Sequence, residues 1–250
     1  MMRLVHTKIP ALVLTMLSLT AVSGAASAGV RESGGGIAVH CGAGTAKESY
    51  QLLDLYEATA SGYRDVMEPW SGADRIDLIE YALDPVMTFD WSRSVTLYDN
   101  AKEIDEDLSR RQYLEAHPNP RHGLPIRVGR VEFADSLERI ETDFHLMAAV
   151  PANCELVQLA VQRWEDRYTS AFVFNHQVWN KLDLVNQAAA ILHEVIYEED
   201  RQYNHAEYSD ATRYEVGILF TTGAHSYNEY DALESVKFSL SGGFHGFSFR

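Results

Sequence analysis

The sequence predicts an α+β fold in a single domain. Apolar residues at helical spacing dominate the first half of the chain, and short runs with strand-like composition occupy much of the second half. The two cysteines, Cys41 and Cys154, lie one in each half, and an isolated pair in an oxidising compartment most often forms a disulfide. We therefore expect one disulfide-stapled domain over residues 37–250, with a helix-rich first half and mixed strands in the second.

The first 28 residues have the layout of a secretory signal peptide. Arg3 and Lys8 give a positive start, residues 9–22 form an apolar stretch, and Ala26-Ser27-Ala28 is a small-residue cleavage site. The apolar stretch is short and contains a proline and three hydroxyl residues, which disfavours a membrane anchor. We expect cleavage after Ala28, export to the periplasm or the extracellular space, and no membrane span after removal of the signal.

The mature chain, residues 29–250, would be strongly acidic. Loss of the signal removes two basic residues and no acidic ones, which leaves 19 bases against 36 acids and a net charge of −17. This charge argues against nucleic acid or an anionic lipid surface as a partner. A cationic ligand or a polybasic partner suits it better, although a solvated surface that keeps an exported protein soluble is the simpler explanation.

The first half of the mature chain begins with a predicted flexible leader over residues 29–36, which ends in three glycines. Residues 37–41 follow as a short strand, and helical spacing starts at Lys47. A second helix is expected over residues 74–83, where Pro85 should stop it. A third helix with a polar outer face fits residues 95–114.

A proline-rich loop over residues 116–125 predicts an exposed connection and a candidate subdomain boundary. Beyond it, Asn175 and Asp183 are good N-caps for a short helix and a longer one. Strand-like segments and a C-terminal β-hairpin are expected over residues 126–133, 156–161, 171–174 and 236–249.

The predicted helix over residues 184–199 contains the one stretch that looks chemical, His193-Glu194-x-x-Tyr197. One face of this helix is apolar, and the opposite face carries small residues beside Asn186, His193 and Tyr197. A helix that is apolar or small nearly all round is usually buried. We therefore expect His193 and Tyr197 to meet in the interior or at the floor of a cleft.

One interpretation of this stretch is a zinc hydrolase, in which two histidines one turn apart bind the metal and a glutamate activates water. Here Tyr197 stands where the second histidine would be, so no metal ligands are assigned. His205 and Glu207 are the nearest further candidates beside His193. We expect no cofactor, and zinc is the alternative.

Two metal-free interpretations remain. In the first, the stretch is a buried polar cluster in which Glu194 forms an ion pair with Arg213 of the next helix and His193 bonds to a carbonyl or to Tyr197. In the second, His193 acts as a general base that Glu194 or Tyr197 orients. The catalytic candidates are therefore His193, Glu194 and Tyr197.

Three segments of the chain resemble a group of uncharacterised exported bacterial proteins. They are Gly34-Gly35-Gly36-x-x-Val39-x-Cys41 with the following Leu52–Ala58 run, Pro151-Ala152-x-Cys154-x-Leu156, and Trp179-x-x-Leu182 with Leu192-His193-Glu194-x-x-Tyr197. That group carries an Asp-Ser-x-x-x-Arg element after the His-Glu helix, where this chain has the altered Ser209-Asp210-x-x-Arg213. The resemblance implies export, a disulfide and one intact domain, and it implies no particular activity.

Two functions are consistent with these patterns. The first is a non-enzymatic envelope or secreted protein that binds a protein or small-molecule partner, which predicts that His193 is enclosed. The second is a hydrolase, metal-dependent or not, centred on His193, Glu194 and Tyr197, which predicts an open pocket beside the helix.

Overall fold

The computed structural model of the chain describes residues 31–62, 65–116, 130–138, 146, 148–164, 170–206 and 208–221. The predicted signal peptide and the predicted C-terminal hairpin lie outside these residues, as does all of the proline-rich loop except Ala116. The described residues form helices and two small sheets, so the α+β class and the Cys41–Cys154 disulfide are confirmed.

One sheet has the strand order β1-β6-β7-β4 and the other the order β3-β2-β5. All neighbouring strands are antiparallel except β4 and β7, which run parallel. The strands are β1 (Arg31–Gly34), β2 (Ile37–Cys41), β3 (Ser49–Leu52), β4 (Val131–Ala134), β5 (Cys154–Gln158), β6 (Ala160–Trp164) and β7 (Ser170–Asn175).

The two sheets are joined by one bent antiparallel ribbon. Strands β1 and β2 follow each other in the chain and pair with β6 and β5, in a register that stays the same on both sides of the bend (Gly34↔Val161 and Ile37↔Gln158). At the bend the N–H groups of Leu159 and Ala160 both donate to the carbonyl of Gly36, each over 3.0 Å. The ribbon therefore changes from one sheet to the other at Gly35–Gly36.

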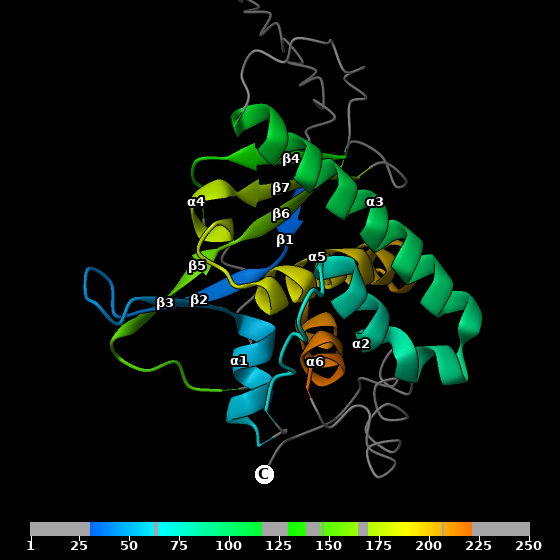
Figure 1. Ribbon diagram of the computed structural model, residues 1–250, viewed down its shortest axis with the longest axis horizontal. Coiled ribbons are helices and arrows are strands. Elements are labelled where there is room, and N and C mark those ends of the chain that lie inside the picture. Colours follow the sequence, from blue (N-terminus) through cyan, green and yellow to red (C-terminus); the bar gives the residue numbers. More distant parts are fainter. Residues whose placement is uncertain are drawn as a thin grey trace, which may run out of the picture.

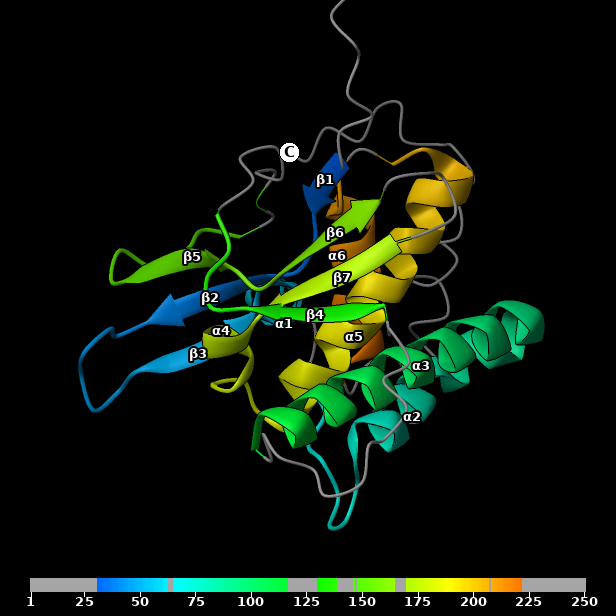
Figure 2. The same cartoon turned by 90° about the horizontal axis from the view of Figure 1, so that it is seen from above.

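Helix α5 is the central element of the fold. It packs against α2, α3 and α6 and against strands β3 and β6, and Figures 1 and 2 show it between the four-stranded sheet and the α2–α3 pair. The helices are α1 (Leu53–Ala60), α2 (Arg75–Phe89), α3 (Trp91–Ala116), α4 (His176–Trp179), α5 (Leu184–Glu199) and α6 (Asp210–Leu219), and a π-helix, η1 (Asp200–Asn204), continues α5.

Several local predictions are confirmed. Asn175 and Asp183 cap α4 and α5, since their side chains accept hydrogen bonds from the N–H groups of Val178 and Asn186. The long helix in the first half is present as α3, and the strand over residues 37–41 is β2. Helices occur in both halves, however, so the predicted concentration of helices in the first half is not clearly seen.

Other predictions need correction. Residues 31–34 of the predicted flexible leader form strand β1, because β6 offers them an edge to pair with. The predicted helix from Lys47 starts only at Leu53, after strand β3. Pro85 lies inside α2 rather than ending it, and its buried position shows that packing outweighs the lost backbone hydrogen bond. The run over residues 156–161 is split at Leu159 between β5 and β6.

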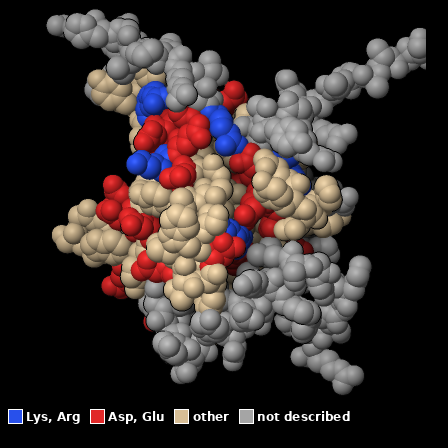
Figure 3. Space-filling model, turned by 90° about the vertical axis from the view of Figure 1, so that its right-hand side faces the viewer, with Lys and Arg blue, Asp and Glu red and all other residues tan. Residues whose placement is uncertain are grey.

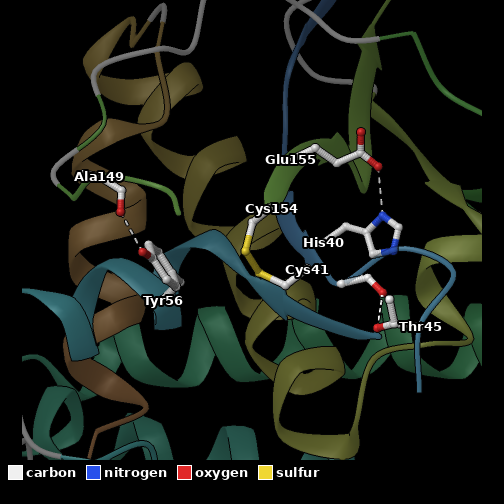
Figure 4. The surroundings of a disulfide bond; sticks show 8 residues. His40, Cys41, Thr45, Tyr56, Ala149, Cys154 and Glu155 are labelled. Atoms are coloured by element: carbon white, nitrogen blue, oxygen red, sulfur yellow. Dashed lines mark hydrogen bonds and ion pairs between the residues drawn. A yellow bond between two sulfur atoms is a disulfide. The ribbon is translucent and has the colours of Figure 1, made fainter. Parts of the chain in front are cut away.

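The disulfide closes the far end of the bent ribbon. Cys41 of β2 and Cys154 of β5 are register partners, and their Cα atoms lie 4.0 Å apart. Figure 4 shows the bond beside His40, whose Nδ1 lies 2.9 Å from a carboxylate oxygen of Glu155. The bridge spans 113 residues, and in the chain-entropy model such a loop stabilises the fold by about 4–5 kcal/mol.

The main apolar core lies between α5, the α2–α3 pair and the four-stranded sheet, and a smaller cluster surrounds the disulfide. No helix among the described residues is both long enough and apolar enough to cross a membrane.

Candidate functional site

All three catalytic candidates lie on α5, in the interior of the protein. His193, Glu194 and Tyr197 are each 0% exposed. The helix buries them because most of its other positions carry apolar or small side chains, including Ala188, Ala189 and Ala190. Tyr197 lies near His193, with ring centroids 6.2 Å apart.

The hydrogen-bonding face of α5 contacts the end of β3 and the first turn of α1. Near the start of α5, Asn186 Oδ1 accepts a hydrogen bond from the N–H of Leu52 over 2.7 Å. Two turns further on, His193 Nδ1 lies 2.7 Å from Oδ2 of Asp54, and the Asp54 side chain is as fully buried as that of His193. The polar residues of this face therefore anchor the beginning of α1.

Glu194 lies at the bend of the ribbon. Its Oε1 accepts a hydrogen bond from the N–H of Gly36 over 2.6 Å, and its Oε2 accepts one from Gln162 Nε2 over 3.1 Å. The same amide nitrogen of Gln162 also donates to the backbone carbonyl of Glu194 over 2.7 Å. The carboxylate thus connects α5 to the bend between β1 and β2 and to β6.

The glycines at the bend leave room for this carboxylate. A Cβ atom at Gly35 would lie 2.6 Å from Glu194 Oε1 and 2.8 Å from the carbonyl oxygen of Ala160, closer than real Cβ contacts. A Cβ at Gly36 would lie 3.4 Å from the same carboxylate oxygen, which is close to ordinary contact. Gly35 is therefore required by the position of Glu194, and the glycine run and the His-Glu helix form one structural unit.

The pKa of Glu194 is raised above its ordinary value because the carboxyl group is completely buried. The neighbouring His193 and the hydrogen bonds from Gly36 and Gln162 oppose this shift. The folded state therefore holds a proton on Glu194 more readily than the unfolded chain does.

Arg213 is paired differently from the prediction. Its Nε lies 3.2 Å from Oε2 of Glu57, another fully buried residue of α1, and its Nη2 lies 3.0 Å from Asp210. The predicted Glu194–Arg213 pair is therefore replaced by Glu57–Arg213. The reason is the close packing of α6 on α1, where a Cβ at Gly217 would lie 2.7 Å from the carbonyl oxygen of Asp54.

Two of the three candidate metal ligands, His193 and His205, lie in different surroundings. His193 is buried, whereas His205 is exposed at the end of η1, and Glu207 lies outside the described residues. In the part of the chain that the structure describes, no group of three or more His, Cys, Asp or Glu side chains is arranged to hold a metal ion.

A second polar cluster, which sequence patterns did not reveal, lies where α5 passes into η1. The guanidinium of Arg93 on α3 binds Glu215 of α6 over 2.7 Å and Glu199 over 2.8 Å. Beside them, Asp200 accepts hydrogen bonds from Thr212 over 2.8 Å and from Asn204 over 3.1 Å. Burial raises the pKa of Asp200 to about 6; the Thr212 hydrogen bond opposes the shift and the charge of Glu215 adds to it.

Gly35→Ala tests the close approach of the Glu194 carboxylate to the glycines at the bend. We expect this substitution to lower the free energy of unfolding by about 2–4 kcal/mol, because the new methyl group forces the carboxylate or the ribbon to move. Gly36→Ala is the matched control. It should lower the free energy of unfolding clearly less, because its new Cβ would lie 3.4 Å from Glu194 Oε1, close to an ordinary contact distance. Urea denaturation of both variants measures the difference, and equal losses would contradict the close approach.

Asp200→Asn tests the second cluster through pH. A carboxyl group whose pKa is about 6 when folded and 3.8 in the reference state takes up its proton preferentially in the folded protein. Its contribution to the free energy of unfolding therefore falls as the pH rises from about 4 to about 6. We expect Asp200→Asn to gain stability relative to wild type across this window, by at most about 3 kcal/mol.

Denaturation curves at several pH values measure this gain. The exposed Asp135→Asn is the control for removal of a surface carboxylate. A difference between Asp200→Asn and wild type that does not change with pH would contradict the raised pKa of Asp200.

No protein-family model matches the chain, and no curated protein or solved structure shows significant similarity to it. Its function is therefore inferred from the chemistry of its own residues.

Proposed function

We propose that this protein is exported and acts by binding a partner rather than by catalysis, and that the His193 cluster holds its fold together. The observation that carries the proposal is the complete burial of His193, Glu194 and Tyr197. A catalytic group must reach the atoms of its substrate, whereas His193 and Glu194 are directed at other parts of the same chain.

Each polar contact in the cluster joins separate elements of the fold. Asp54 and His193 join α1 to α5, and Glu57 and Arg213 join α1 to α6. Glu194 joins α5 to the bend of the ribbon. Buried charges are tolerated only where they are paired and hydrogen-bonded, and such contacts fix one arrangement of the elements around them.

Export is supported by the signal-like first 28 residues and by the disulfide. Disulfides persist in oxidising compartments and are rare in the reducing cytosol. The strong acidic excess suits a partner that carries positive charge.

A hydrolase is the second candidate, and one observation favours it. A carboxylate 2.7 Å from an imidazole nitrogen is the arrangement by which hydrolases orient a general-base histidine. In this candidate Asp54 would orient His193, and α1 would have to move away from α5 to admit a substrate.

His193→Ala separates the two candidates. We expect the variant to lose about 3–5 kcal/mol of unfolding free energy, because Asp54 is left buried without its cationic or hydrogen-bonding partner. His205→Asn is the control: His205 is exposed and has φ 55°, a conformation that asparagine tolerates, so stability should be unchanged. Urea denaturation gives the stabilities, and a panel of ester, peptide and glycoside substrates tests wild type for turnover.

Asp54→Asn covers the case in which His193→Ala does not fold, since asparagine keeps an acceptor of similar shape. The proposal would be overturned in favour of the hydrolase if wild type turns over a substrate and Asp54→Asn or His193→Ala abolishes this turnover while the variant keeps the stability of wild type. Lost stability without any turnover in wild type supports it.

A further inference from the structure

We propose that the exposed face of α2, together with Trp70 before it and Trp91 at the start of α3, binds a basic, arginine- or lysine-rich peptide segment of a partner protein. This rests on the proposed binding function and names the chemistry of the partner. The surface, called the α2 face below, consists of six side chains: Trp70, Glu80, Tyr81, Asp84, Met87 and Trp91.

The helical period separates this face from the core. The buried residues of α2 include Leu78, Ile79 and Leu83, which pack toward α3 and α5. Glu80, Tyr81, Asp84 and Met87 fall on the opposite side of the helix and are exposed. The α2 face is therefore fixed on a rigid element whose inner side is anchored in the core.

Large apolar side chains are concentrated here. Trp91 is 66% exposed, Trp70 48%, Tyr81 41% and Met87 38%, which is half of the eight large hydrophobic residues exposed in the described part of the chain. The rings of Trp70 and Tyr81 meet edge to face with centroids 5.7 Å apart. Grouped exposed aromatic residues are typical of interaction surfaces, whereas single ones are ordinary.

The charge around these aromatic residues has one sign. Residues 65–91 contain seven acidic residues and one basic residue, a net charge of −6. The basic residue, Arg75, is held by Asp105, Ser109 and Gln187. Figure 3 faces the α2–α3 side of the molecule and shows more acidic than basic surface.

Glu80 and Asp84 form no ion pair with the described residues. They lie beside Tyr81 on the same helix face, and no cation among the described residues pairs with them there. Acids beside exposed rings provide both contacts that a guanidinium or ammonium group makes, an ion pair and a cation–π contact. The chain already uses this chemistry elsewhere, where the guanidinium of Arg201 lies 3.8 Å from the ring centroid of Trp164.

A basic peptide fits this surface better than the other occupants do. Nucleic acid and anionic lipid would be repelled by the acids. A second copy of the chain would bring two faces of the same negative charge together.

Fluorescence anisotropy with fluorescein-labelled octa-arginine tests the proposal on the disulfide-bonded mature protein at physiological salt. Trp70→Ala/Tyr81→Ala leaves the net charge unchanged and should weaken binding about tenfold, because two cation–π contacts are lost. Glu80→Gln/Asp84→Asn should weaken it about threefold or more. The control Asp135→Asn/Glu138→Gln removes the same charge from exposed positions after β4 and should leave the affinity within about twofold of wild type.

Three results would overturn the proposal. They are no binding of the peptide by wild type, equal weakening by the α2-face and control acid variants, and a dimer in sedimentation equilibrium that Trp70→Ala/Tyr81→Ala dissociates. None of these results concerns His193. The proposed function is tested by turnover and stability at His193 and Asp54, so the two failures can be told apart.

Discussion

The fold depends on one buried carboxylate at the point where its two sheets meet. The ribbon formed by β1–β2 and β5–β6 changes sheets at Gly35–Gly36, and a bend of this kind leaves the N–H of Gly36 in need of a partner. Glu194 supplies that partner from the middle of α5 and receives a second hydrogen bond from Gln162. The central helix and both sheets are thereby fixed to one another by a single side chain.

Helix α5 is also connected, through buried polar side chains, to helices α1 and α6. His193 contacts Asp54, and Glu57 of the same helix α1 continues the polar chain to Arg213 on α6. Because these groups are fully buried, removing any one of them leaves a charge or a polar atom without a partner in a medium of low polarity. A cluster in which each member positions a different element is suited to specifying the fold. We therefore propose the surface, and above all the α2 face, as the place of the binding function.

The elements that depend on local patterns were predictable from the sequence, and those that depend on tertiary pairing were not. Apolar spacing and the Asp183 cap define α5, and the burial of His193 follows from the composition of the helix. Strand β1 could not be predicted, because its place depends on an edge offered by β6 far along the chain. Asp54 and Glu57 stand out in the sequence as two acids three residues apart in an otherwise apolar helical segment. Only the packing of α1 in the structure shows that they pair with His193 and Arg213.

Native-state hydrogen exchange tests most directly whether the α5 cluster is a structural core. The account predicts that the amides of β2, of α5 around His193 and Glu194, and of Gly36 at the bend exchange only through global unfolding and share one free energy of opening. Exchange around residues 190–199 through a local opening of much lower free energy would contradict it, because a region that opens readily could admit a substrate to His193.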